Sequence, residues 1–378
     1  MLVLPRTFCS DLGQNARREK TVTKSIIICC DGTGDQFGPH NSNVVKMFEL
    51  IAKTGQQVAY YNPGVGTMAA PSVVTRIGRR FNRLLGLGFG IGIMANVEDA
   101  HRFLMETFEP GDQIYIFGFS RGAYTARALA GLIKKCGILK HGQNNLLRYA
   151  SRIYARESDI KVSNGFRRSF ARKTDIAFLG LWDTVSSVGW IYNPVTLPFT
   201  ANNPFVRTVR HAVSIDERRA FFRSNLWGRA RDGQDIEQVW FPGVHSDVGG
   251  GYPNGETGPA DIALDWMLRQ VEGRLDIDPK ARERLLYEGR VNIENPKIHM
   301  SLRGGWWLNE ILPKPYYYQT PEKAWKKGYR INLGRRRKMP DGSAIHQSVL
   351  DRAAKQGYAP ENLAKTYQVA PWDGTAPK

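Results

Sequence analysis

The chain has 378 residues, of which 42% are hydrophobic and 11% aromatic, and this composition excludes an intrinsically disordered protein. Its length allows one large domain or two ordinary ones. With 53 basic against 35 acidic residues, the formal net charge is +18, which favours negatively charged partners over basic ones. The 4 cysteines show no spacing typical of a zinc site, and we expect them to be buried and reduced.

The first residues do not resemble a secretory signal. The apolar start MLVL is interrupted by Pro5 and Arg6, so it lacks the apolar core of about 7–15 residues that such a signal needs. The longest apolar run, Leu84–Ala95, is rich in glycine and too short to span a bilayer. We therefore expect a protein that is cytoplasmic as synthesised, with no signal peptide and no transmembrane helix.

Apolar strands alternate with helical patterns along most of the chain. Continuous apolar, β-branched segments predict strands at 25–30, 57–61, 113–117, 175–182 and 237–241, and apolar spacing predicts helices at 43–52 and 96–108. Such alternation is typical of an α/β protein whose mostly parallel central sheet carries helices on both faces. We expect an N-terminal extension at 1–23 and a core at 24–275.

Residues 276–378 lack this alternation, and we expect them to form a C-terminal cap or a peripheral extension. They contain the turn-forming stretch PKPYYYQTP and a basic run at 335–338. Further basic clusters lie at 76–83 and 167–173. These clusters suit peripheral contact with an anionic membrane, and equally a solvated surface. No nucleic-acid-binding motif accompanies them, so no nucleic-acid partner is expected. The sequence does not indicate the oligomeric state.

The segment GFSRG at 118–122 stands between a predicted buried strand and a helical pattern. Ser120 therefore lies on a sharp strand-to-helix turn, with a glycine two residues away on either side. This is the G-x-S-x-G arrangement of a nucleophile elbow, in which small neighbours let the backbone hold a strained serine. The pentapeptide alone is weak evidence, but its place between strand and helix predicts that Ser120 is a catalytic nucleophile.

Two further polar residues follow predicted strands. Asp183 comes after DIAFLGLW and His245 after EQVWFPGV, so the chain order is Ser, Asp, His with intervals of 63 and 62 residues. In open α/β sheets the working residues lie beyond the carboxyl ends of the strands. A serine needs a neighbouring base, and an imidazole oriented by a carboxylate supplies one. We predict Ser120 as nucleophile, His245 as base and Asp183 as the residue that orients it.

Alternatives remain for the acid and the base. Asp183 also suits a helix N-cap, and His245 an ordinary loop histidine. His346 is a rival base, although it lies near the start of a predicted helix, where a capping role explains it. Asp247 is a rival acid, or a residue that supports the site from behind the triad.

The oxyanion that forms during acyl transfer needs two N–H donors. We expect one to be the amide of Arg121, which follows the nucleophile at a helix N-terminus. The glycine-rich loop DGTGD after the first strand offers the other, from Gly32 or Thr33. This chemistry needs no cofactor and no metal, and none is expected.

Several blocks of the sequence together resemble a known family. They are ICCDGTGDQFG, GFSRGAYTARALAGLI, LGLWDTVSSVG, AVSIDERR and VWFPGVHSDVGGGY, all within 24–270. The chain is similar to the α/β-hydrolase domain family that includes phospholipase effectors of the type VI secretion system. The resemblance implies an α/β-hydrolase-like fold and a Ser-Asp-His esterase, in some members a phospholipase A, with Ser120, Asp183 and His245 at the matching positions. It also implies delivery by a secretion system that needs no signal peptide.

These observations together predict a serine hydrolase that cleaves carboxylic esters, with lipid or phospholipid acyl esters as substrates. The alternative is a non-catalytic basic scaffold on a hydrolase fold that binds lipid or nucleic acid. The apolar segment Leu84–Ala95, next to a basic run, suits a lid over acyl chains or contact with a bilayer. It also suits a buried crossover, which is the simpler interpretation.

Overall fold

The structure of the chain is a computed structural model that describes residues 23–32, 38, 40–64, 89–156, 160–185, 189–190, 193–194, 197–253, 255–287, 296–319 and 325–372. The predicted N-terminal extension, apart from residue 23, and the basic run at 76–83 lie outside the described residues. So does the first part of the apolar segment, 84–88. Among the described residues, no helix is long and apolar enough to cross a bilayer.

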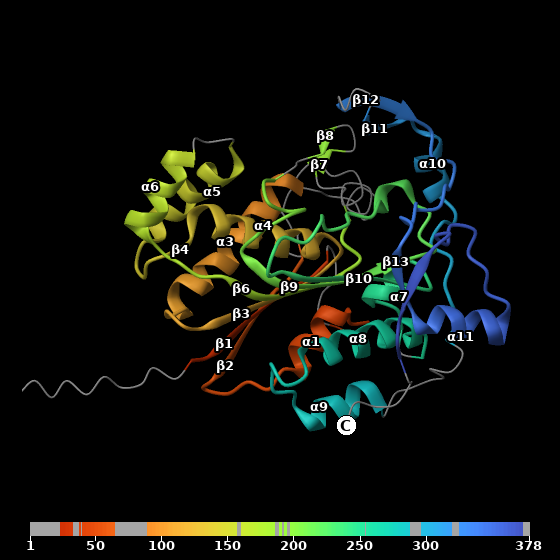
Figure 1. Ribbon diagram of the computed structural model, residues 1–378, viewed down its shortest axis with the longest axis horizontal. Coiled ribbons are helices and arrows are strands. Elements are labelled where there is room, and N and C mark those ends of the chain that lie inside the picture. The colour runs from red at the N-terminus through yellow and green to blue at the C-terminus, as the bar shows by residue number, and fades with distance from the viewer. Residues whose placement is uncertain are drawn as a thin grey trace, which may run out of the picture.

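An eight-stranded sheet forms the centre of the molecule (Figure 1), with the order β14-β13-β10-β9-β6-β3-β1-β2. Its strands are β1 (Ser25–Cys30), β2 (Gln57–Asn62), β3 (Gln113–Phe119), β6 (Ile176–Trp182), β9 (Val206–Ser214), β10 (Asp235–Phe241), β13 (Ser343–His346) and β14 (Tyr367–Ala370). Every neighbouring pair in this sheet is parallel. The prediction of an α/β fold around a parallel sheet is confirmed.

Helices cover both faces of the sheet. On one face lie α3 (Phe89–Thr107), α4 (Ser120–Cys136), α5 (Leu147–Ala155) and α6 (Ile160–Phe170), and on the other α1 (Asn43–Leu50), α8 (Gly258–Val271) and α9 (Pro279–Arg282) (Figure 1). Further helices are α7 (His245–Gly249), α10 (Trp306–Ile311) and α11 (Gln347–Gln356). Short strand pairs complete the fold: β4 (Ile138–Leu139) with β5 (Ala171–Arg172), β7 (Gly189–Trp190) with β8 (Asn193–Pro194), and β11 (Lys314–Gln319) with β12 (Trp325–Arg330).

Alternate residues of β1 point into two separate cores. Ile26, Ile28 and Cys30 belong to the cluster beneath α3 and α4, whereas Ile27 and Cys29 belong to the cluster beneath α1 and α8. This follows from the two-residue period of a strand that is buried on both faces. The expectation that Cys29 and Cys30 are buried is confirmed, and their side chains face opposite ways.

The order of the strands places the site. The chain runs from β1 outward to β2, returns to β3 on the other side of β1, and then continues in the opposite direction across the sheet. Ligands of open parallel sheets bind where the order reverses, outside the carboxyl ends of the strands. Ser120 follows β3 at this point, and Asp31 follows the neighbouring β1. Asp183 follows β6, the next strand along.

The C-terminal part of the chain differs from the expectation. Residues 276–378 were expected to form a cap or a peripheral extension, but they contribute β13 and β14 to the central sheet. Two other elements also differ: α3 begins at Phe89, within the apolar segment, and β9 was not predicted. Arg210 and His211 interrupt the apolar pattern of β9, although both are buried in it.

Candidate active site

Ser120 occupies a strained turn between β3 and α4. Its φ is +58°, in the left-handed region that residues other than glycine rarely adopt. It is the first residue of α4, and only 7% of it is exposed. The turn therefore presents the hydroxyl at the carboxyl edge of the sheet, as a nucleophile elbow requires.

The two glycines of the elbow are needed because backbone passes close to both. A Cβ on Gly118 would lie 2.6 Å from the carbonyl oxygen of Gly122. One on Gly122 would lie 2.2 Å from the carbonyl oxygen of Cys30, at the end of β1. Only hydrogen fits at these two positions, so the G-x-S-x-G spacing follows from the close approach of α4 to the ends of β3 and β1.

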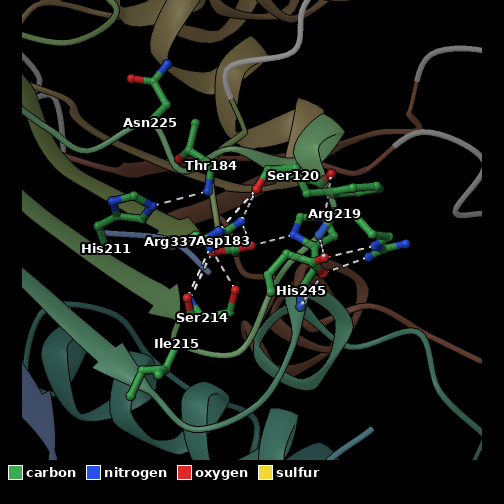
Figure 2. A network of polar contacts seen from close by, with 12 residues as sticks. Ser120, Asp183, Thr184, His211, Ser214, Ile215, Arg219, Asn225, His245 and Arg337 are labelled. Carbon is green, nitrogen blue, oxygen red and sulfur yellow. Dashed lines mark hydrogen bonds and ion pairs between the residues drawn. The ribbon is translucent and has the colours of Figure 1, made fainter. Parts of the chain in front are cut away.

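His245 lies against the Ser120 hydroxyl. It is the first residue of the short helix α7, which begins just beyond β10, and only 4% of it is exposed. Its Nε2 lies 2.8 Å from Oγ of Ser120, and its Nδ1 lies 2.5 Å from Oδ2 of Asp183 (Figure 2). The neutral tautomer that fits both contacts donates from Nδ1 to Asp183 and accepts at Nε2 from Ser120.

Asp183 is fully buried and is also held in an unusual conformation, with φ of +38°. The backbone beside it is fixed: the Thr184 N–H donates to Nε2 of His211 at 3.1 Å. Oδ1 of Asp183 accepts a hydrogen bond from the Ser214 N–H at 2.9 Å. The guanidinium of Arg337 donates to Oδ1 at 2.6 Å and to Oδ2 at 3.0 Å. Both carboxylate oxygens are therefore used.

These contacts set the protonation states of the pair. Burial alone would raise the pKa of Asp183, but the charge of Arg337 and the hydrogen bonds from His245 and Arg337 hold it well below its usual range. Burial lowers the pKa of His245, and Asp183 opposes part of that shift. The resting site therefore holds an ionised Asp183 beside a neutral His245, which is the state a general base needs.

Two aromatic rings and a second ion pair hold the imidazole in place. The rings of Phe119 and Phe222 each lie 4.7 Å from that of His245, measured between centroids. The buried Glu217 accepts the backbone N–H of His245 at 3.2 Å and pairs with the guanidinium of Arg219 at 2.8 Å. Burial opposes ionisation of Glu217, but Arg219 outweighs it and lowers its pKa to about 2.

The predicted oxyanion donors have different outcomes. Arg121 is the second residue of α4, where the helix presents the positive end of its dipole. The Gly32 N–H donates to Oδ1 of Asp31 at 2.7 Å, so in this geometry it is already committed to that carboxylate. Thr33 lies outside the described residues. The role of Arg121 as an oxyanion donor stays a prediction.

The rival residues do not reach Ser120 or the imidazole of His245. His346 is the N-cap of α11, where its Nδ1 accepts from the Ser348 N–H at 3.3 Å. Asp247 accepts the Val244 N–H and so caps α7, and its Oδ1 pairs with Nδ1 of His299 at 2.6 Å. The structure thus brings together Ser120, His245 and Asp183 and assigns helix capping to the two rivals.

Sequence reasoning missed Arg337 and Glu217. Arg337 belongs to the basic run at 335–338, whose composition predicts surface charge, yet it is buried against Asp183. Glu217 lies in the block AVSIDERR, which was noted only for its resemblance. No local pattern separates Arg337 from its neighbours in the run. Among the described residues, no group of three or more His, Cys, Asp or Glu is arranged to hold a metal ion.

A curated relative, the uncharacterized protein YEL023C of Saccharomyces cerevisiae, is 37% identical over 233 residues. That match covers 56% of this chain and 34% of the yeast protein, so the chain spans about a third of its relative's length.

Two solved structures are more distant. An uncharacterized protein from Pseudomonas aeruginosa shares 20% identity with a TM-score of 0.42, covering 72% of this chain and 49% of that one. The Tle1 effector bound to the VgrG spike of the type VI secretion system shares 20% identity with a TM-score of 0.37, covering 62% and 52%.

The family comparison covers most of the chain. The model of the type VI secretion system (T6SS) Tle1-like phospholipase effector catalytic domain matches residues 24–270, from the start of β1 almost to the end of α8. Ser120, Asp183 and His245 all lie within the match. The chain belongs to the family of T6SS Tle1-like phospholipase effector catalytic domains.

Proposed function

We propose that this protein is a serine hydrolase that cleaves carboxylic esters of lipids through an acyl-enzyme intermediate. The observation that carries the proposal is the continuous contact from Ser120 through His245 to Asp183, at 2.8 Å and 2.5 Å, with the serine on a strained elbow. A serine, an imidazole and a carboxylate in this order of contact define a catalytic triad by geometry and role.

The first half of the reaction follows from these contacts. Oγ of Ser120 attacks the ester carbonyl while its proton passes to Nε2 of His245. Asp183 stabilises the imidazolium that forms, because it already accepts a hydrogen bond from Nδ1. The Arg121 N–H, at the start of α4, would donate to the developing oxyanion. His245 then returns the proton to the leaving alcohol, which departs as the acyl-serine forms.

The second half repeats these steps with water. His245 takes a proton from the water as it attacks the acyl-serine, and the carboxylic acid leaves when Ser120 regains its proton. The packing of Phe119 and Phe222 against the ring holds His245 in one position through both halves. The protein thus needs no group beyond its own side chains and backbone for the complete cycle.

Lipid substrates are supported by a surface beside the site, which we call the α10 surface. It is formed by exposed apolar side chains of α10 and of the segments before and after it: Met300, Trp307, Leu308, Ile311, Leu312, Ile331 and Leu333. The turn at 332–334 contacts α10, since the Leu333 N–H donates to the carbonyl of Glu310. In Figure 1, α10 lies beside β11 and β12 at the upper right. Exposed apolar groups gathered in this way mark an interaction surface.

The charge of the α10 surface indicates an anionic lipid partner. Among the described residues from 296 to 338, the one acidic side chain is Glu310, and it is buried. The exposed charged residues there are all basic: Lys297, Arg303, Lys326, Arg330, Arg335 and Lys338. Apolar side chains beside basic ones favour the interface of an anionic bilayer.

The α10 surface is also connected to the triad. Trp306, the first residue of α10, packs edge-on against Phe222, with ring centroids 5.7 Å apart. Phe222 in turn contacts the ring of His245. A bilayer held by α10 would therefore present its lipids near the catalytic serine.

The activity is tested with two substrates and one variant. Wild type and Ser120→Ala are compared on a short p-nitrophenyl ester and on vesicles of anionic phospholipid. We expect turnover of both substrates by wild type and its loss in Ser120→Ala. Equal turnover by the variant would refute the serine mechanism.

The α10 surface is tested by replacing two of its exposed residues. The double variant Trp307→Ser, Leu308→Ser should lose about a hundredfold or more of the activity on vesicles, since each apolar side chain that the bilayer buries contributes about 1.5–3 kcal/mol. Turnover of the short ester should not change. The matched control is Ile160→Ser, Val162→Ser on α6, where both side chains are also exposed. Equal loss of vesicle activity in the two double variants would refute the assignment of α10.

The alternative function is a basic scaffold that binds lipid without cleaving it. In that case vesicle binding would survive Ser120→Ala, and wild type would turn over no ester. Delivery by a secretion system, which the family name suggests, stays a prediction of that resemblance.

A further inference from the structure

The most unusual contact in the site is made by Arg337. This residue lies more than 150 positions along the chain from Asp183, in the segment between β12 and β13. Its side chain is buried, whereas Arg335 and Lys338 in the same run are exposed. A triad carboxylate can orient its histidine with local N–H donors alone, so the added guanidinium changes both the orientation and the electrostatics of the carboxylate.

The guanidinium holds the carboxylate with two parallel hydrogen bonds. It donates to Oδ1 of Asp183 at 2.6 Å and to Oδ2 at 3.0 Å, which is the planar fork that arginine forms with a carboxylate. It is itself fixed, because it donates to Oγ of Ser214 at 2.7 Å and to the carbonyl of Phe222 at 3.1 Å. Arg337, together with the Ser214 N–H, thus sets the rotation of Asp183 that points Oδ2 at His245.

The charges around His245 nearly cancel. Asp183 faces Arg337, and Glu217 faces Arg219, so two carboxylates stand against two guanidinium groups. His211 on β9 is buried, and burial lowers its pKa to about 3, so it adds no charge. Asp247, on α7 itself, is paired with His299. With a neutral His245, the group formed by Asp183, Arg337, Glu217 and Arg219 carries no net charge, and protonation of the imidazole would add one uncompensated positive charge.

We infer that Arg337 is a positioning residue of the triad: it fixes the Asp183 carboxylate toward His245, and its charge lowers the pH at which the base is lost. This inference rests on the proposed function. Without Arg337, the same group would carry one net negative charge, and protonation of His245 would neutralise it. The base would then be lost at a higher pH.

Two substitutions separate geometry from charge. Arg337→Gln removes the charge but retains an N–H donor that can reach Asp183. Arg337→Lys keeps the charge but replaces the planar fork by one ammonium group. Arg229→Gln is the control, since it removes an exposed arginine charge that belongs neither to the site nor to the α10 surface.

The measurement is kcat/KM on the short ester as a function of pH. Its acid limb, the fall in kcat/KM toward low pH, marks the pH at which the catalytic base of the free enzyme becomes protonated. We expect the limb of Arg337→Gln to lie roughly one pH unit above wild type. The limb of Arg337→Lys should stay in place, while its kcat falls about tenfold to a hundredfold at unchanged KM because the carboxylate is no longer oriented. Arg229→Gln should match wild type in both.

An unchanged limb in folded Arg337→Gln, or a wild-type kcat in Arg337→Lys, would overturn the inference. Should Arg337→Gln not fold, the kcat of Arg337→Lys decides. Wild-type turnover that is absent or independent of Ser120 would instead be a failure of the proposed function. In that case an NMR titration of the His245 ring measures its protonation without any turnover, with the ring signal assigned by its absence in His245→Asn. The midpoint of this titration should lie at a higher pH in Arg337→Gln than in wild type, and an unchanged midpoint would overturn the inference.

Discussion

Replacing Gly122 by alanine tests whether the elbow depends on the contact between α4 and β1. An added Cβ would lie 2.2 Å from the carbonyl oxygen of Cys30, and 2.4 Å from that of Asp31. Both atoms are backbone at the end of β1, which is paired on both sides by β2 and β3. Neither atom can move without disturbing the sheet, so α4 must shift by about 1 Å to restore an ordinary contact distance.

The cost of this shift can be bounded. Overpacking of a dense interior costs about 1–3 kcal/mol and occasionally more, whereas alanine gains about 1 kcal/mol over glycine inside a helix. We expect Gly122→Ala to lower the free energy of unfolding by about 2 kcal/mol. The displaced Ser120 should also reduce turnover by about a hundredfold.

The control is Gly165→Ala in α6. A Cβ at Gly165 meets no atom within 4 Å, so the same substitution should raise the free energy of unfolding by up to about 1 kcal/mol. Urea unfolding measures both stabilities, and turnover of the short ester measures the elbow. If Gly122→Ala were as stable and as active as wild type, the reasoning about the close approach would be refuted.

Three further predictions concern the buried polar groups. Wild-type kcat/KM should have its acid limb below pH 6.5, because burial lowers the pKa of His245 and keeps it neutral; a limb above that value contradicts this. Asp183→Asn should lower kcat about 10⁴-fold, by favouring the wrong tautomer of His245, and should destabilise the fold by about 3–5 kcal/mol in thermal unfolding, by leaving Arg337 without its partner. Burial lowers the pKa of His346 to about 3, so its folded form binds fewer protons than its unfolded form, and stability falls as the pH drops from about 6.5. His346→Asn keeps an N-cap for α11, and it should reduce the slope of the free energy of unfolding against pH, between pH 5.5 and 4.5, by about 1.4 kcal/mol per pH unit. An unchanged slope would show that other groups cause the acid sensitivity.

The three residues in contact at the site were predictable because each has a local signal. Ser120, Asp183 and His245 all come directly after, or within a few residues of, an apolar strand. Parallel strands bring their carboxyl ends to one edge of the sheet, so residues far apart in the sequence converge there. The order of the strands, however, determines which of them become neighbours, and the sequence pattern does not contain that order.

Arg337 and the C-terminal strands could not be predicted, for a related reason. Nothing local distinguishes a buried arginine from an exposed one in a run of four basic residues, since only its partner Asp183 makes burial favourable. β13 and β14 are only four residues long, and β14 lies at the edge of the sheet with three of its residues exposed. Such short strands carry too little apolar pattern to be recognised.

The most direct test of the account is the site of covalent labelling by a fluorophosphonate probe, read by mass spectrometry of the digested protein. The account predicts one rapidly labelled residue, Ser120, with labelling slowed by several orders of magnitude in His245→Ala. Labelling of the folded wild-type protein at another residue, or at Ser120 at the same rate in His245→Ala, would contradict the claim that these residues form a catalytic triad.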